Sequence, residues 1–146
     1  ELIGDLLQLM VASKADYTIV FRELASLPKE ITPLKRGFYV PSDAQLDAQW
    51  NAWLTRWHQQ LSCSGEPEEI TASMQRTNPA ITWREWLIAP AYEQAARGDY
   101  SLVHELQTVF RNPYKPLSPE LAARYDQLRP REFFGAGGIS HYSCSS

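Results

Sequence analysis

Hydrophobic residues recur at intervals of three and four along most of the chain, which is the spacing of one face of an α-helix. The first such segment predicts a helix from about Leu2 to Ser13. A second helix is expected after Asp16, which can cap it, and Pro28 should stop it. The apolar positions are Leu2, Ile3, Leu6, Leu7 and Met10 in the first segment and Tyr17, Val20, Phe21, Leu24 and Leu27 in the second.

The third predicted helix has the clearest pattern. It follows a loop at residues 28 to 41 that holds three prolines and a glycine, and Ser42 and Gln45 have the spacing of a capping box. Its stripe of three tryptophans could form a ligand cage, but large aromatic side chains at this spacing are usually buried in a core. We therefore expect Trp50, Trp53 and Trp57 to pack against the helices that carry Phe21 and Trp86. The apolar positions of this helix are Leu46, Trp50, Trp53, Leu54, Trp57 and Leu61.

Proline and glycine divide the rest of the chain into four further helices. Pro67 begins a short one, and Asn78-Pro79 predicts another that should be kinked or split at Pro90 and end at Gly98. The next begins at Asp99 or Ser101, and the last opens at Ser118-Pro119 and runs to Leu128. Their apolar positions are Ile70 and Met74; Trp83, Trp86, Leu87 and Ala91; Leu102, Val103, Leu106, Val109 and Phe110; and Leu121, Tyr125 and Leu128.

No segment alternates apolar and polar residues for long enough to predict a strand. The fold class is therefore all-α, an irregular helical domain of about six or seven helices over residues 1–128. Residues 129–146 should form an irregular, flexible tail that ends in Ser-Cys-Ser-Ser. With 146 residues, 44% of them hydrophobic, the chain can bury the core of one domain.

Composition and charge exclude several classes of protein. A net charge of -3 with no cluster of Lys and Arg argues against a nucleic-acid partner. The chain lacks an 18-residue apolar span and a signal peptide, so we expect a soluble protein with no membrane contact. Its two cysteines, Cys63 and Cys144, are too few for a disulfide framework, which fits a cytoplasmic location.

Few residues indicate chemistry. The possible soft metal ligands are scattered without the spacing of a zinc site, so no metal or other cofactor is expected to bind here. Three carboxylates, Glu66, Glu68 and Glu69, fall in a predicted first turn, where the helix dipole is reason enough for them. A glycine-rich stretch at residues 135 to 138 lacks the Lys and Ser or Thr of a phosphate loop, and we interpret it as a hinge. The scattered ligands are His58, His104, His141, Cys63 and Cys144.

Cys144 is the main candidate for chemistry, because a cysteine near a chain end is rarely there for burial. Redox chemistry or disulfide exchange is therefore the leading interpretation. His141 could assist the thiolate or be a polar tail residue. Cys63 could pair with Cys144 if their α-carbons come within about 7 Å, which the sequence does not determine.

Short matches in a fixed order run along the whole chain, and together they resemble the C-terminal region of the selenoprotein O family. Members of that family are kinase-like protein adenylyltransferases, which transfer AMP from ATP to protein hydroxyls, and some carry selenocysteine where this chain has Cys144. Departures at Trp83-Arg84-Glu85, Ala89-Pro90 and residues 129 to 133 indicate a divergent branch. The matches are Asp16-Tyr17-Thr18, Phe21-Arg22, Met74, Asn78-Pro79-Ala80, Arg84, Trp86-Leu87, Gly98-Asp99, Asn112-Pro113-Tyr114 and the terminal Ser143-Cys144-Ser145-Ser146.

The resemblance implies a division of labour within a longer protein. The family's ATP-binding loop, lysine–glutamate pair and magnesium-binding acidic residues belong to a kinase-like part, and none has a matching position here. Because the chain opens on Glu1 within an amphipathic pattern and without an initiator methionine, we expect that part, which binds ATP and Mg2+ and acts on protein substrates, to lie upstream. No catalytic residue is expected in these 146 residues. The resemblance carries over only Cys144, with a cysteine of the kinase-like part as its disulfide partner.

Two other functions stay open from the residues alone. The chain could be a non-catalytic helical scaffold or protein-interaction module. A thiol-dependent oxidoreductase is less favoured, because the chain has no Cys-x-x-Cys motif.

Overall fold

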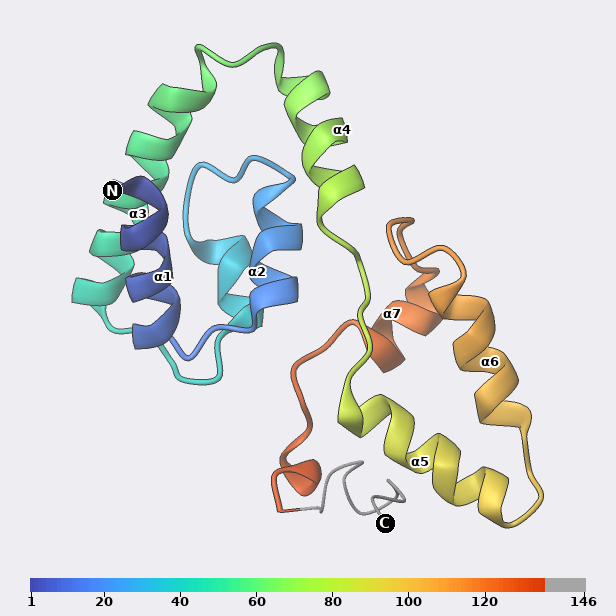
Figure 1. Cartoon of the computed structure of the whole chain (residues 1–146). Helices are drawn as coiled ribbons and strands as arrows, with labels where there is room; N and C mark the ends of the chain where they lie inside the picture. The colour runs from blue at the N-terminus through green and yellow to red at the C-terminus, as the bar shows by residue number, and fades with distance from the viewer. Residues whose placement is uncertain (136–146) are drawn as a thin grey trace. The chain divides into compact units, whose positions relative to one another are not determined.

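The computed structural model describes residues 1–135, which form seven α-helices and two short 3-10 helices without a strand (Figure 1). The all-α prediction is confirmed. The chain divides into two compact units, a first unit, Glu1–Ala80, and a second unit from Ile81 onward. Each unit has a hydrophobic core of its own, where the sequence predicted a single domain.

The first unit contains α1 (Leu2–Ala12), α2 (Tyr17–Leu24), a 3-10 helix (Thr32–Gly37), α3 (Ala44–Leu61) and α4 (Pro67–Thr77). α1 lies along α3, and α2 packs on the 3-10 helix (Figure 1). The 3-10 helix falls within the predicted loop at residues 28 to 41. The buried core residues are Leu6, Leu9, Met10, Val20, Leu24, Ile31, Leu34, Phe38, Trp50, Trp53 and Leu54.

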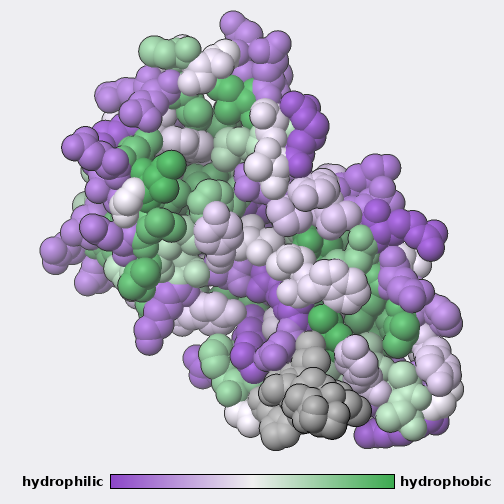
Figure 2. Space-filling model, in the orientation of Figure 1, coloured by the Kyte–Doolittle hydropathy of each residue, from purple (hydrophilic) through white to green (hydrophobic). Residues whose placement is uncertain are grey.

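The inner face of α1 is buried, as its spacing predicts, but its outer face is not. Leu6, Leu9 and Met10 belong to the core, whereas Ile3 and Leu7 are exposed. Figure 2 shows hydrophobic surface in the area that α1 occupies in Figure 1. The sequence pattern therefore assigned two exposed residues to the buried face of this helix.

Asp16 caps α2 as predicted, because its Oδ1 accepts a hydrogen bond of 3.0 Å from the Ile19 N–H. Tyr17 was predicted to face inward, but it is exposed and stacks on Phe21 with ring centroids 4.2 Å apart. At the first position of the helix, its side chain has no earlier turn to pack against.

The cap of α3 differs from the predicted one. Asp43, not Ser42, accepts the hydrogen bond of the third helical residue, from Leu46 N–H at 2.8 Å. Ser42 Oγ instead donates to Asp47 Oδ1 at 2.5 Å. The predicted capping box of Ser42 and Gln45 was therefore wrong by one residue, because the adjacent aspartate caps equally well.

Trp50 and Trp53 are buried in the first core, which confirms their assignment as core residues. The Trp50 indole N–H donates to Ser13 Oγ at 2.9 Å, and that of Trp53 donates to the carbonyl of Leu2 at 2.8 Å. Trp57 is half-buried and stacks on Trp53. Trp86, on the other helix that was predicted to pack against them, belongs to the core of the second unit.

The second unit contains α5 (Glu85–Ala96), α6 (Ser101–Phe110), α7 (Pro119–Tyr125) and a 3-10 helix (Arg131–Phe133). Ser118 caps α7 as predicted, although the helix ends three residues before Leu128. Phe133, which the sequence assigned to the tail, packs against the second core. A flexible tail over residues 129–146 stays a prediction, since 136 to 146 lie outside the described residues. The core residues are Ile81, Trp86, Leu87, Ala91, Leu106, Val109 and Tyr125.

Asn78 and Pro79 were predicted to begin a helix, but no helix starts there. Asn78 ends α4, and α5 starts only at Glu85. The residue before a proline avoids the helical region, and Asn78 is accordingly extended, with φ −105° and ψ 112°. Pro90 was predicted to kink or split α5, and it lies inside one continuous helix, so the predicted split is wrong. Leu87 and Ala91 on either side of it are buried, and their packing stabilises the helix. A kink at Pro90 stays a prediction.

Candidate functional site

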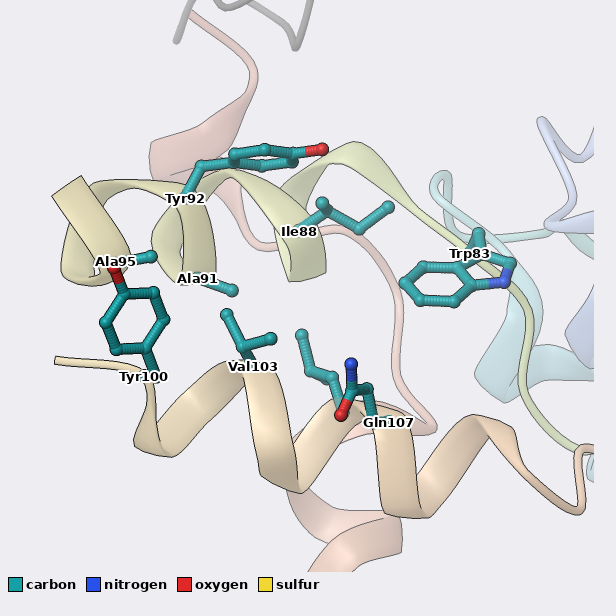
Figure 3. A pocket seen from close by; sticks show the side chains of 9 residues that line it. Trp83, Ile88, Ala91, Tyr92, Ala95, Tyr100, Val103 and Gln107 are labelled. Atoms are coloured by element: carbon teal, nitrogen blue, oxygen red, sulfur yellow. The ribbon is translucent and has the colours of Figure 1, made fainter. Parts of the chain in front are cut away.

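An apolar groove of about 290 Å³ lies between α5 and α6 of the second unit (Figure 3). Ala91 of α5 and Leu106 of α6 line it and are buried. Three aromatic residues at its edge, Trp83, Tyr92 and Tyr100, are exposed. Exposed aromatic side chains around an apolar depression are typical of surfaces that bind another molecule.

The turn between α5 and α6 brings the two walls of this groove together. Gly98 has φ +87°, which only glycine adopts without strain, and its N–H donates to the carbonyl of Ala95 at 2.9 Å. The Asp99 N–H donates to the carbonyl of Gln94 at 3.0 Å, which completes a Schellman motif. The Asp99 carboxylate then accepts the Ser101 N–H at 2.9 Å, and this hydrogen bond lowers the pKa of Asp99. The sequence correctly predicted that Gly98 terminates the helix, two residues after the last residue of α5, and that the next helix starts at Asp99 or Ser101; α6 starts at Ser101.

Trp83 stands at one end of the groove (Figure 3). It was predicted to lie inward on a helix, but it precedes α5 and is 59% exposed. Its ring stacks on Phe110, with centroids 4.0 Å apart and planes 19° from parallel. The stacking on Phe110 fixes the orientation of the Trp83 indole, most of whose surface is exposed to solvent.

The lining determines what the groove can bind. Its polar groups are the amide of Gln107, the hydroxyls of Tyr92 and Tyr100, and the indole N–H of Trp83, and its lining contains no carboxylate, cationic side chain or thiol. Such a site suits an apolar side chain or a ring with one hydrogen-bonding group. The lining contains no histidine, carboxylate, lysine or thiol to act as a general acid or base, and no cation to bind a phosphate.

A polar cluster joins α6 to α7 on the same unit. The Tyr125 hydroxyl donates to Glu105 Oε1, and the Arg124 guanidinium lies 2.7 Å from the same oxygen. Burial, together with the hydrogen bond to Glu105, raises the pKa of Tyr125 to about 12. The hydrogen bond from Tyr125, with a smaller effect of Arg124, lowers the pKa of Glu105. Because Tyr125 is a core residue, we interpret the cluster as a structural link between the helices.

In the first unit, Arg22 connects α2 to the end of α4. Its Nη1 donates to the carbonyls of Gln75 and Asn78, both at 3.0 Å. Arg22 and Asn78 both belong to the short matches that suggested a family. In the structure, the hydrogen bond between them holds the end of α4 against α2.

Cys144, the predicted redox residue, lies outside the described residues, as do His141 and most of the glycine-rich stretch at 135 to 138. Cys63 is exposed and has a free thiol in the turn after α3. A disulfide between Cys63 and Cys144 therefore stays untested.

The remaining candidates lie apart. His58 Nε2 is 2.9 Å from the carbonyl of Pro28, and His104 is exposed on α6. Glu66, Glu68 and Glu69 are exposed at the start of α4, where the helix dipole favours them. Among residues 1 to 135, no three His, Cys, Asp or Glu side chains come close enough together to hold a metal ion. No helix in that range is long and apolar enough to span a bilayer.

Comparison with known proteins matches residues 1–111 to the family described as Protein adenylyltransferase SelO. This chain belongs to the SelO family. A relative called Protein nucleotidyltransferase YdiU from Aromatoleum aromaticum is 34% identical over 152 residues, covering 99% of this chain and 28% of its own length. Those from Tolumonas auensis and Salmonella heidelberg are 34% and 32% identical, covering 100% and 99% of this chain and 29% and 28% of their own lengths.

The SelO match confirms the resemblance found in the sequence. It covers the first unit and the helices α5 and α6 that form the groove. The chain spans less than a third of the length of these SelO relatives. Three of the matching residues have structural roles: Asp16 caps α2, Arg22 bonds the end of α4, and Gly98 forms the turn after α5.

The sequence pattern predicted a single apolar face for α5, made of Trp83, Trp86, Leu87 and Ala91, and therefore did not indicate the groove. Ile88, Tyr92 and Ala95 recur at four and three residues on that helix and line the groove. This second stripe was a visible signal of another apolar face. The other wall of the groove is on α6, which the short turn at Gly98 brings next to α5.

Proposed function

We propose that this chain is the helical region of a longer protein that transfers AMP from ATP to Ser, Thr or Tyr hydroxyls of protein substrates. The observation that carries the proposal is membership of the SelO family, together with relatives named protein nucleotidyltransferases that are about three and a half times as long. A cytoplasmic location and an upstream kinase-like part are included in the proposal.

ATP and Mg2+ would bind to that kinase-like part. The side chains described here do not fit them. Magnesium needs converging oxygen ligands, and residues 1 to 135 bring no three acidic, His or Cys side chains together. The groove between α5 and α6 has no cationic side chain for phosphate groups. We therefore derive no catalytic step from this chain.

AMP transfer tests the proposal directly. The longer polypeptide, incubated with labelled ATP, magnesium and a generic protein substrate, should label that substrate. The 146-residue chain alone should not, because it lacks the groups that position a magnesium nucleotide. Labelling by the purified short chain would contradict the assignment of catalysis to the other part.

A redox function for Cys144 belongs to the same proposal and is supported by the family resemblance. In a disulfide with a cysteine of the kinase-like part, two thiols lose two protons, and two electrons pass to an oxidant such as oxidised glutathione. Cys144 should then be alkylated in the reduced protein and protected after mild oxidation. Cys144→Ser should remove the redox dependence of AMP transfer and leave the fold unchanged.

Mass spectrometry of the oxidised protein would identify the partner sulfur, including Cys63 if it is the partner. Cys63→Ser separates the two pairings: the redox dependence should persist in this variant if the partner cysteine lies in the kinase-like part, and should be lost if Cys63 is the partner. Equal alkylation of Cys144 in both redox states, with activity indifferent to reductant, would remove the support for a switch.

A non-catalytic interaction module is the second candidate, and the groove between α5 and α6 favours it. Tyr92→Ala or Tyr100→Ala would weaken the binding of a partner to the groove and leave AMP transfer to a generic substrate unchanged. If the longer polypeptide carries out no AMP transfer but loses a protein partner in these variants, the interaction module is the better description.

A further inference from the structure

We infer that the outer face of α1, formed by Ile3, Leu7 and Val11, docks against the part of the longer polypeptide that these 146 residues do not cover. The three residues are spaced four apart and so lie in one row along the helix. Their exposed fractions are 73%, 46% and 78%. Figure 2 shows hydrophobic surface in the corresponding area. The inference rests on the proposal that the chain belongs to a longer protein.

This face carries no charge. α1 has one charged side chain, Asp5, and its Oδ2 lies 2.5 Å from Arg56 Nη2 of α3, away from the apolar row. A surface helix of a soluble protein normally presents charged or polar side chains opposite its buried face. A helix that is apolar on both faces is typical of a protein interior.

The helix does not need its outer face to stay in place. Leu6, Leu9 and Met10 are buried in the first core. The Trp53 indole N–H also holds the first turn through the carbonyl of Leu2. The row Ile3, Leu7 and Val11 is thus a second apolar face, on a helix that is already fixed by its first one.

The size of the face favours an intramolecular partner over a second copy of the chain. A stable interface between separate proteins uses about 20 to 30 residues on each side, and this row offers three. A segment of the same polypeptide is present at high effective concentration, so a small apolar contact is enough. The chain covers only 28% or 29% of its relatives' length, so most of such a protein lies outside it.

Thiol alkylation in the longer polypeptide tests the inference. Val11→Cys places a thiol in the row, and Gln8→Cys places one on an exposed position of the same helix, on the flank that faces α3. Mass spectrometry of the peptide that carries each cysteine gives its alkylation rate in the folded protein. This rate is divided by the rate of the same cysteine in the protein unfolded in urea. We expect the normalised rate of Val11→Cys to be at least about tenfold below that of Gln8→Cys, because a covered thiol reacts only when the contact opens.

The protection should not change on dilution. Equal normalised rates at the two positions, with the helix content of the protein unchanged, would overturn the inference. Protection of Val11→Cys that disappears on dilution would also overturn it, because the face would then contact a second copy. Neither readout depends on AMP transfer, so the inference and the proposed activity can fail separately.

Discussion

The two units differ in one respect: both expose aromatic side chains, including Tyr17 and Tyr39 in the first unit, but within residues 1 to 135 only the first exposes large aliphatic ones. In the first unit, α1 carries a row of aliphatic residues, Ile3, Leu7 and Val11. In the second, the exposed large apolar side chains of the described residues are all aromatic, and three of them line the groove between α5 and α6. Aliphatic side chains have no group that can hydrogen-bond to water, whereas tyrosine and tryptophan do.

This difference indicates two kinds of contact. An aliphatic row is costly to leave in water, so a permanent neighbour should cover it. An aromatic edge can stay solvated when the groove is empty and still gain apolar contact when a partner binds. We therefore expect α1 to be an internal face of the longer protein and the groove to be a site of reversible binding.

The largest expected effect comes from comparing the replacement of one tryptophan by alanine in each unit. Trp53 is 3% exposed, and Trp53→Ala should reduce the free energy of unfolding by about 3–5 kcal/mol, because it leaves a cavity in the first core. Trp83→Ala removes the exposed ring at the groove and should cost less than about 1 kcal/mol. Urea unfolding followed by circular dichroism would compare them. A cost for Trp83→Ala similar to that for Trp53→Ala would mean that the groove edge is part of a core.

The features predicted correctly from the sequence depend on local interactions. Asp16 and Ser118 cap the helices that follow them, and each bonds a backbone N–H three residues ahead. The tryptophans of α3 are spaced at the helical period within a long helix, so their shared face follows from the pattern alone. Gly98 ends α5 because its conformation suits the turn.

The features that were missed depend on residues far apart in the chain. Residues 78 and 79 by themselves predicted a helix start. In the structure the Asn78 carbonyl accepts a hydrogen bond from Arg22, which is 56 residues away and cannot be anticipated from the local sequence. The groove needs one face from each of two helices and a tryptophan from the segment before them. The division into two cores likewise follows from which helices meet, which no single segment determines.

A smaller effect should come from the hydrogen bond between Tyr125 and Glu105. Tyr125→Phe removes the donor, and we expect a loss of about 1 kcal/mol in the free energy of unfolding. The pKa of Tyr125 is raised from 10.0 to about 12, so the native link is fully stabilising below pH 10 and weakens as pH rises toward 12. The pKa of Glu105 is lowered in the folded protein, so its carboxylate contributes fully to the stability of the fold above its ordinary pKa of 4.5. This contribution to stability is lost as the pH falls through the lower pKa of the folded state.

The pH dependence of unfolding would check this link in the second unit. Tyr125→Phe should flatten the loss of stability between pH 10 and 12. Tyr17→Phe in the first unit is the matched control, since it removes the hydroxyl of an exposed tyrosine. An unchanged alkaline limb in Tyr125→Phe would show that folding does not raise the pKa of Tyr125.

The smallest expected effects, of opposite sign, come from one glycine in each unit. Gly4 lies inside α1, with open space where a Cβ would be, so Gly4→Ala should stabilise the first unit by about 0.5–1 kcal/mol through better helix propensity. Gly98 also has open space but has φ +87°, so Gly98→Ala should destabilise the second unit by about 1 kcal/mol through backbone strain. Thermal unfolding would measure both. Among residues 1 to 135 neither methyl group would meet another atom. A loss of stability in Gly4→Ala would therefore contradict the assignment of Gly4 to a regular helix.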